Sequence, residues 1–355
     1  MLAVIMAGGV GERFWPSSRR QRPKQLLDLT GRGSMIRLTL ARLEGVAAPD
    51  EIYVLTNREQ RDAILAEVSS LVPAANVIGE PDVRNTAPCI GLAAVVARAR
   101  GGDRTMLVLP ADHLVTPVER FRELVRAGAR HVESHADLLT LGIRPTRAET
   151  GYGYIRLAEP AGDGAAPLFR VEAFLEKPDA ERARRLVADG CLWNSGMFMW
   201  RTDTVLGGIA THLPELGTVL DRIAAGMGTR PLAEVLNEEY SRAPAISIDF
   251  GLMEKARNVV ALRADFEWND VGSWEFIRDA HPADGDGNVV VGDHILIDGS
   301  NNTIVSRDRL VAIVGVDDIV VVEDGGAILV CRRDRAQDVK RVVAELKERG
   351  REDLT

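Results

Sequence analysis

The first 145 residues alternate short apolar runs with longer segments of helical pattern, and this alternation constrains the fold more than any other feature. Short apolar runs are typical of strands buried on both faces, and segments of roughly 10–15 residues between them suit crossover helices. Such alternation produces βαβ units with parallel strands, so we predict a Rossmann-like, mixed and mainly parallel sheet flanked by helices. The expected strands are 2–7, 51–56, 76–79, 105–109 and 138–143, and the expected helices are 34–43, 58–69, 87–100 and 117–134.

The rhythm loosens after residue 145, where the pattern suggests an inserted lid or substrate portion within one α/β domain that covers residues 1–280. The expected strands here are 151–157, 169–176 and 196–200, and the expected helical segments are 179–187, 204–224 and 231–240.

Residues 281–355 form a separate pattern of short β-rich runs divided by Gly, Asp and Asn turns. A spacing of about eight residues between the runs suggests a small β-helix-like module. The expected strands are 288–291, 294–297, 303–306, 310–314, 319–323 and 327–330, followed by an amphipathic helix at 337–349. Because no low-complexity linker precedes the module, we expect it to dock on the first domain.

The charge balance restricts the partners. Lys and Arg total 44 and Asp and Glu total 52, which gives a formal net charge of -8 without any Lys/Arg run. Such a chain is not expected to bind nucleic acid or an anionic membrane, although local basic groups can still hold a small phosphorylated ligand.

The chain shows neither a signal-peptide pattern at its start nor a run of the ~20 apolar residues that span a bilayer. Its cysteines, Cys89, Cys191 and Cys331, are widely spaced and form neither a disulfide framework nor a CxxC metal site. We therefore expect a cytoplasmic protein with reduced thiols.

The strongest local signal is a glycine-rich loop directly after the first strand, with Gly8, Gly9 and Gly11 following Ala7. Such glycines let the backbone approach phosphate oxygens, although a simple strand-to-helix turn would look alike. The loop lacks the Gly-Lys-Ser/Thr ending of a Walker A motif and the third glycine of the dinucleotide fingerprint, where Phe14 stands instead.

Two cations follow the glycines. Arg13 suits bidentate contact with the outer phosphates of a triphosphate, and Lys24 suits a point charge on the phosphorus under attack. Together they could clamp a triphosphate from two sides.

The segment GGVGERFWP at residues 8–16, followed by PKQ at 23–25, resembles the signature of the sugar nucleotidyltransferases. Its Trp-Pro continuation resembles the mannose-1-phosphate guanylyltransferase branch of that superfamily. Further segments resemble the same branch, in order over roughly residues 1–280: EP 80–81 with RNTAP 84–88, LPADH 109–113, ETGYGY 149–154, FLEKP 174–178, WNSGMF 193–198, SID 247–249 with MEK 253–255, and WNDVGSW 268–274.

This resemblance implies an enzyme that transfers GMP from GTP to α-D-mannose 1-phosphate, giving GDP-mannose and pyrophosphate. In-line attack by the sugar phosphate needs no general base, and Mg²⁺, Arg13, Lys24 and Lys177 would stabilise the transition state. Phe14 and Leu26 depart modestly from the family pattern. The chain also ends before the phosphomannose isomerase domain of many relatives, so we expect that second activity to be missing.

Asp112 and Asp270 are the expected Mg²⁺ ligands, because both follow expected strand ends and offer hard oxygen atoms. A lone loop aspartate is more often a turn former, and only the resemblance favours the metal role. With Arg13, Lys24 and Lys177, they form the predicted catalytic set.

The resemblance assigns the sugar phosphate to Gly153, Glu176, Lys177, Asn194 and Asp270. Glu176 would accept sugar hydroxyls and Lys177 would hold the phosphate, whereas a solvated charge pair is the structural alternative. Asp249 and Lys255 either support the sugar site from behind or are only structural. Four nearby aromatic residues either line the pocket or belong to the core: Tyr152, Tyr154, Trp193 and Phe198.

The nucleotide is expected to contact the glycine loop, the two cations and a base-selecting group. The complete expected set is Ala7, Gly8, Gly9, Gly11, Arg13, Lys24, Glu80, Asn85, Thr86, Pro110 and Asp112. Guanine offers N–H donors that the Glu80 carboxylate or the backbone near Pro110 can accept. Thr86 has an alternative role as the N-cap of the following helix.

Two alternatives remain open at this stage: the same chemistry with another nucleotide or sugar, such as glucose 1-phosphate, and a non-catalytic ligand-sensing relative. His131 and His135 stand one helical turn apart without an evident third ligand, so a zinc site is not expected. The apolar strands of the C-terminal module suit packing on the first domain or on another subunit, and we expect a homodimer.

Overall fold

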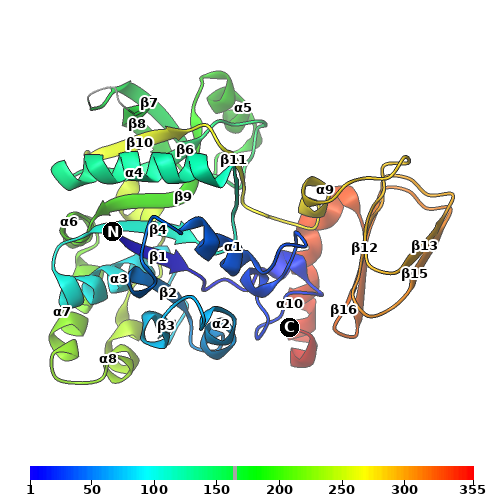
Figure 1. The fold of residues 1–355 in the computed structure, drawn as a ribbon, viewed down its shortest axis with the longest axis horizontal. Coiled ribbons are helices and arrows are strands. Elements are labelled where there is room, and N and C mark those ends of the chain that lie inside the picture. Colours follow the sequence, from blue (N-terminus) through cyan, green and yellow to red (C-terminus); the bar gives the residue numbers. More distant parts are fainter. Residues whose placement is uncertain (163–165) are drawn as a thin grey trace.

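The computed structural model describes residues 1–162 and 166–355, and it consists of a large α/β part and a smaller β part (Figure 1). The central sheet has the order β3-β2-β1-β4-β9-β6-β10-β8-β7. Its strands are β1 (Leu2–Met6), β2 (Ile52–Asn57), β3 (Val77–Glu80), β4 (Thr105–Pro110), β6 (Leu138–Ile143), β7 (Tyr154–Pro160), β8 (Leu168–Leu175), β9 (Leu192–Arg201) and β10 (Val259–Ala264).

The sheet is mixed, as predicted. Strands β3, β2, β1 and β4 pair in parallel, as do β6 and β10, whereas β9 runs antiparallel to both β4 and β6. Strands β1, β4, β6 and β10 therefore all end at the same edge of the sheet, the place where ligands gather in open α/β folds.

Helices cover both faces of the sheet, which leaves β1 entirely buried apart from its last residue. One face packs against α3 (Thr86–Gly101), α6 (Thr202–His212), α7 (Pro214–Met227) and α8 (Leu232–Glu239). The other packs against α1 (Met35–Arg42), α2 (Arg61–Val68), α4 (Val118–Ser134) and α5 (Ala180–Ala188).

Most expected elements are confirmed, with boundaries shifted by a few residues. Ser34 caps α1 as expected, since its hydroxyl accepts the Arg37 N–H. The expected helix 204–224 is two helices, because Pro214 cannot continue the first and instead begins the second. Strand β10 was missed, as was the ribbon of β5 (Leu114–Thr116) and β11 (Glu267–Asn269), whose strands are too short for a periodic signal.

The C-terminal module winds as a short β-helix. Strands β12 (Val289–Val291), β14 (Thr303–Ser306) and β16 (Ile319–Asp324) stack in parallel, and β13 (His294–Ile297) stacks in parallel on β15 (Val311–Val314). Strand β17 (Ala327–Arg332) then turns back antiparallel to β16.

After the module, a 3-10 segment (Arg333–Val339) and α10 (Lys340–Glu348) return to the α/β part (Figure 1). They share one apolar core with residues that follow the glycine loop and with the short helix α9 (Phe276–Ala280). The expected docking of the two parts therefore takes the form of a common core. Among the described residues, no helix has both the length and the apolar character that crossing a membrane requires.

Candidate active site

Lys24 links the glycine loop to both predicted metal ligands. Its side chain is 7% exposed, and its Nζ atom donates hydrogen bonds to Oδ2 of Asp112 at 2.7 Å and to the carbonyl oxygen of Asp270 at 2.8 Å. Gly11 makes room for this lysine: its φ is 76°, and an added Cβ would lie 2.3 Å from the Lys24 Cβ. Both features require glycine at this position.

The loop that carries Asp112 is anchored by α1. The hydroxyl of Thr39 donates to the carbonyl of Ala111 at 3.1 Å, and the guanidinium of Arg42 donates to the carbonyl of His113 at 2.9 Å. Burial works against ionisation of Asp112, but the positive charge and hydrogen bond of Lys24 outweigh it and hold the pKa of Asp112 below its ordinary value. The carboxylate is therefore ionised at neutral pH.

His113 adds no charge beside Asp112. Burial lowers the pKa of His113 to about 4, so the ring is neutral at neutral pH. The indole Nε1 of Trp268 donates to Nδ1 of His113 at 3.2 Å, which leaves the proton on Nε2, 4.0 Å from Oδ1 of Asp112.

Asp270 lies one residue beyond β11 in a tight turn. The amide of Val271, at a φ of 52°, donates to Oδ1 of Asn269 at 2.7 Å. Oδ1 of Asp270 accepts the hydroxyl of Tyr152 at 2.6 Å.

The two carboxylates suit a hard divalent cation. Within residues 1–162 and 166–355, Oδ1 of Asp112 and Oδ2 of Asp270 accept no hydrogen bond, although their partner oxygens do. No group of three or more His, Cys, Asp or Glu residues is placed to hold a metal in this described part of the chain. Carboxylate oxygens are ligands that Mg²⁺ takes together with oxygen atoms of phosphate or water.

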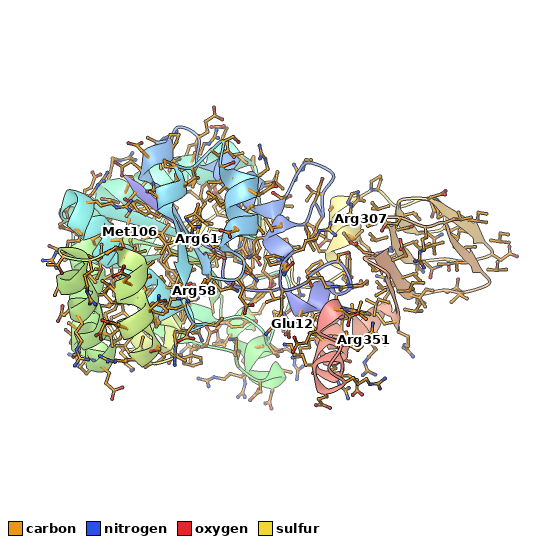
Figure 2. All side chains as sticks on the ribbon, turned by 90° about the horizontal axis from the view of Figure 1, so that it is seen from below. Glu12, Arg58, Arg61, Met106, Arg307 and Arg351 are labelled. Atoms are coloured by element: carbon orange, nitrogen blue, oxygen red, sulfur yellow. The ribbon has the colours of Figure 1, made fainter. Side chains whose placement is uncertain are left out.

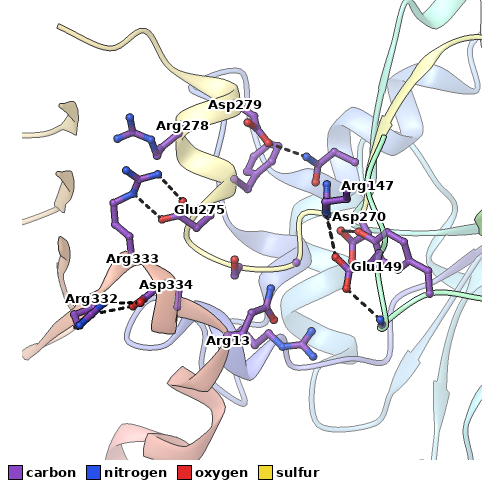
Figure 3. Close-up of a pocket in the computed structure, with 18 of the residues that line it drawn as sticks. Arg13, Arg147, Glu149, Asp270, Glu275, Arg278, Asp279, Arg332, Arg333 and Asp334 are labelled. Atoms are coloured by element: carbon purple, nitrogen blue, oxygen red, sulfur yellow. Dashed lines mark hydrogen bonds and ion pairs between the residues drawn. The ribbon is translucent and has the colours of Figure 1, made fainter. Parts of the chain in front are cut away.

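Arg13 borders a cleft of about 830 Å³ that also touches Tyr152 and Asp270 (Figure 3). It is exposed, and its guanidinium forms no hydrogen bond or ion pair with any described residue. The C-terminal part also lines this cleft, through Arg332, Arg333, Asp334, Ala336 and Gln337. The only site cation without a protein partner in the described structure is thus the one expected to hold the outer phosphates.

Glu80 is buried beside the glycine loop. An added Cβ on Gly8 would lie 3.7 Å from Oε2 of Glu80, while Oε1 accepts the hydroxyl of Tyr240. Burial raises the pKa of Glu80 to about 7, although hydrogen bonds from Tyr240 and Cys89 oppose the rise.

The turn after Glu80 corrects one expectation. Asn85 is the N-cap of α3, at a φ of 70°, and its Oδ1 accepts the Thr86 N–H at 2.8 Å. Thr86 is the first helical residue instead, and its hydroxyl accepts the amide of Ile248 at 2.9 Å. This contact ties the turn to the π-helical segment Asp249–Met253, which contributes to the predicted sugar pocket.

Four predicted sugar-phosphate residues lie together. The amide of Asn194 donates to the carbonyl of Gly153 at 2.8 Å, and Nδ2 of Asn194 donates to Oδ1 of Asp249 at 2.8 Å. Nζ of Lys177 lies 3.4 Å from Oε1 of Glu176. An added Cβ on Gly153 would lie 2.3 Å from Oε2 of Glu176.

The carboxylate of Glu176 is incompletely satisfied. Its Oε2 atom is buried and has no hydrogen-bond partner among the described residues. Burial, followed by the negative charge of Asp249, raises the pKa of Glu176 to about 7 against the opposing effect of Lys177. A ligand hydroxyl would supply the missing donor.

The structure thus forms two groups: Lys24, Asp112 and Asp270 at the glycine loop, and Gly153, Glu176, Lys177 and Asn194 beside Asp249. Ala7, Gly9 and Pro110 lie along the same edge, at or beyond the ends of β1 and β4. Asn85 is exposed, and its side chain serves as a helix cap.

Sequence reasoning missed the supporting roles of Tyr240 and His113, and it left Tyr152 undecided between pocket and core. The hydrogen bond between Tyr240 and Glu80 spans 160 residues, so no local pattern could reveal it. His131 stacks on His135 at 4.3 Å and contacts the buried Asp137 at 2.8 Å, as a structural pair would.

A family model described as nucleotidyl transferase matches residues 2–287, and one described as MannoseP isomerase/GMP-like beta-helix domain matches residues 292–346. The mannose-1-phosphate guanylyltransferase of Escherichia coli is 39% identical over 354 residues, covering 99% of this chain and 75% of that protein. The xanthan biosynthesis protein XanB of Xanthomonas campestris pv. campestris (strain B100) is 40% identical, covering 100% and 75% respectively.

A crystal structure described as mannose-1-phosphate geranyltransferase from Thermus thermophilus is 36% identical, with a TM-score of 0.86, covering 98% of this chain and 99% of that one. A UDP-glucose pyrophosphorylase complexed with UDP-glucose shares the fold alone, at 16% identity and a TM-score of 0.51, covering 79% of this chain and 97% of that one. The chain belongs to the nucleotidyl transferase family. Within that family it is similar to the mannose-1-phosphate guanylyltransferases, and the predicted family, fold class and enzyme class are confirmed.

Proposed function

We propose that this chain transfers GMP from GTP to α-D-mannose 1-phosphate and releases GDP-mannose and pyrophosphate. The observation that carries the proposal is the contact of Lys24 with the carboxylate of Asp112 and with the main-chain carbonyl of Asp270, which brings a cation and both aspartates to the glycine loop. The names of the similar curated proteins support the choice of mannose 1-phosphate and of a guanylyl group.

In the proposed reaction a phosphate oxygen of mannose 1-phosphate forms a bond to the α-phosphorus of GTP, and the bond between that phosphorus and the bridging oxygen to the β-phosphorus breaks. The electron pair leaves with pyrophosphate. The attacking phosphate is already an anion at neutral pH, so no side chain has to remove a proton. Lys24 would face the α-phosphate, Arg13 the β- and γ-phosphates and Lys177 the sugar phosphate, each lowering the repulsion between anions.

Asp112 and Asp270 would hold Mg²⁺ through the carboxylate oxygens that accept no hydrogen bond among the described residues. When bound, the ion supplies positive charge where the phosphates meet. The ionised state of Asp112, which the pKa lowered by Lys24 maintains, supports this assignment.

The nucleotide would lie on the backbone of Ala7, Gly8, Gly9 and Gly11, with the base toward Glu80, Asn85, Thr86 and Pro110. Once ionised, the Glu80 carboxylate would accept guanine N–H groups, and Tyr240 fixes its orientation. The hydroxyl of Thr86 already accepts the Ile248 amide, which leaves it less available to a base.

The sugar would lie between Gly153, Glu176 and Asn194. Oε2 of Glu176, which has no hydrogen-bond partner in the described part of the chain, supports this placement, because a sugar hydroxyl satisfies a buried carboxylate oxygen. Asp249 would hold Asn194 in position rather than touch the sugar itself.

A pyrophosphate-release assay with GTP, ATP, UTP and dTTP, each with mannose 1-phosphate and glucose 1-phosphate, tests the proposal. We expect the highest kcat/KM for GTP with mannose 1-phosphate. A higher value for another pair would assign a different sugar nucleotidyltransferase activity, and no release with any pair would indicate a ligand-sensing relative.

We further propose that residues 1–280 act as the catalytic domain and that residues 281–355 form a short β-helix-like module with a C-terminal helix. We also propose that the chain forms a homodimer through the strands of the module. Exposed apolar side chains on β13, β15 and β17 support the second proposal, among them Ile295, Ile297, Val314, Ile328 and Val330. Light scattering should give a mass near twice 38.7 kDa.

A further inference from the structure

The residues that flank Arg13 are fastened to the C-terminal end of the chain. Arg13 lies in a single 3-10 turn, Glu12–Phe14, that no strand or long helix continues. Glu12 and Lys347 of α10 form an ion pair of 2.6 Å, and the indole Nε1 of Trp15 donates to the carbonyl of Leu354 at 2.8 Å. Figure 2 labels Glu12 and Arg351 at this junction of the two parts.

Apolar packing reinforces these polar contacts. Phe14 and Trp15 are 1% and 6% exposed, and both belong to the core that contains Val339 and Val343 of the C-terminal segment. The indole Nε1 of Trp274 donates to the carbonyl of Trp15 at 3.0 Å, so the turn is held from two directions.

Two residues farther along the loop also contact the C-terminal part of the chain. The amide of Arg20 donates to the carbonyl of Thr355 at 3.1 Å, and Arg22 pairs with Asp324 of β16 at 3.2 Å. The stretch between the glycines and Lys24 is therefore attached both to β16 and to the last residue of the segment 333–355.

We propose that the C-terminal segment 333–355 is a positioning element of the nucleotide site, which holds the Glu12–Trp15 turn so that Arg13 points into the phosphate cleft. The inference rests on the proposed function for the identity of the ligand. Arg13 needs such support because its own side chain has no protein partner in the described structure. Removing one of these contacts lets the turn adopt other conformations. It thereby lowers the fraction of molecules in which Arg13 is placed to contact the phosphates.

The first test removes a single hydrogen bond. Trp15→Phe keeps an aromatic ring in the core but removes the donor to Leu354, and we expect kcat/KM for GTP to fall about fivefold while KM for mannose 1-phosphate stays unchanged. Trp200→Phe is the matched control, because its buried indole nitrogen has no hydrogen-bond partner in the described structure. That variant should lower Tm without changing kcat/KM for GTP.

The second test reverses the ion pair. Lys347→Glu and Glu12→Lys should each lower kcat/KM for GTP about twofold to fivefold, and the double variant should recover the wild-type value. If residue 12 acted only through the electrostatic effect of its charge on the GTP phosphates, Glu12→Lys would instead bind GTP more tightly than the wild type. Lys340→Glu makes the same charge change elsewhere on α10 and should have no effect.

Amide hydrogen exchange gives a readout that needs no turnover. Without bound ligand, the backbone amides of residues 12–18 should exchange faster in Trp15→Phe than in the wild type. In Trp200→Phe their exchange rates should be unchanged. Unchanged exchange together with unchanged kcat/KM for GTP would overturn the positioning role, as would an equal loss for both substrates. A wild-type chain that releases no pyrophosphate from GTP would refute the proposed function, and exchange would still decide this inference.

Discussion

The phenolic hydroxyl of Tyr152 donates a hydrogen bond of 2.6 Å to Oδ1 of Asp270, across 118 residues of sequence. Burial, followed by the charge of Asp270, raises the pKa of Tyr152 above its ordinary value, so the hydroxyl keeps its proton and acts as a donor. The bond fixes one carboxylate oxygen, while the other accepts no hydrogen bond from the residues that the structure describes. Tyr152 therefore orients a proposed metal ligand without binding the metal.

Tyr152→Phe should lower kcat about tenfold, because a hydrogen bond to a charged group contributes about 1.5 kcal/mol. The Mg²⁺ concentration for half-maximal rate should rise in the same variant. Tyr154→Phe is the control, since this buried tyrosine donates to the carbonyl of Glu149 instead. Equal rates in the two variants would contradict the orienting role.

Asp112→Asn and Asp270→Asn should each lower kcat by about 100-fold or more, because each removes a charged oxygen ligand. Steady-state kinetics across a Mg²⁺ titration measures the loss. Asp137→Asn is a suitable comparison, because Asp137 is buried and paired with His131 and Arg170 outside the site. That variant should be less stable but should turn over normally, and near-normal turnover in Asp112→Asn would remove Asp112 from the metal role.

Gly153→Ala should raise KM for the sugar phosphate severalfold, because the new Cβ would lie 2.3 Å from Oε2 of Glu176 and 3.3 Å from Cβ of Asn194. KM for GTP should change little. Gly151→Ala, two residues earlier, meets its nearest neighbour at 3.4 Å and should be tolerated. A sugar KM that stays at the wild-type value in Gly153→Ala would place the sugar elsewhere.

Glu176 should make sugar binding depend on pH. Its pKa is raised to about 7, chiefly by burial, and only the ionised carboxylate accepts hydroxyl hydrogens on both oxygens. KM for mannose 1-phosphate should therefore fall as pH rises from 6 to 8. In Glu176→Gln, KM for mannose 1-phosphate should depend less on pH, because only ionisation of the substrate phosphate then remains. Parallel pH profiles of this KM in the variant and the wild type would refute the assignment to Glu176.

Glu80 should make stability depend on pH with a defined sign. Its folded pKa of about 7 exceeds its ordinary value of 4.5, so the native state holds a proton more tightly than the unfolded chain. The stabilisation of the native state by protonated Glu80 is complete below about pH 4.5 and is lost as pH rises through about 7. The free energy of unfolding changes by up to about 3 kcal/mol over this range. In urea unfolding, Glu80→Gln should therefore gain stability relative to wild type between pH 5 and pH 8, whereas a constant difference would show that Glu80 does not titrate in this range.

Local signals predicted the framework of the fold because they depend on neighbouring residues. The buried run at β1, the Ser34 cap and the Gly11 turn each follow from a few adjacent side chains. The short ribbon of β5 and β11 could not be predicted this way, since each strand exists through its partner about 150 residues away.

The candidate site divides in the same manner. Residue type at Lys24 indicated phosphate chemistry, and the family resemblance assigned Asp112 and Asp270 to a metal. The structure brings Lys24 into contact with both aspartates. The helix cap could not be placed between Asn85 and Thr86 from residue type alone, because both side chains favour caps. In the structure Asn85, at a φ of 70°, lies outside the helix, and Thr86 is the first helical residue. The distant backbone at Ile246 and Ile248 holds the start of the helix through hydrogen bonds with Ala87 and Thr86.

The common core of Phe14 and Trp15 with Val339 and Val343 sets an order of events during synthesis. The glycine loop leaves the ribosome before the side chains that finish its packing, which are more than 320 positions behind it. Since a growing chain folds from its N-terminal part, the sheet can form while the phosphate loop is still unsupported. On the proposed positioning role, a nascent chain halted before α10 would carry the predicted site residues while the Glu12–Trp15 turn still lacked its support.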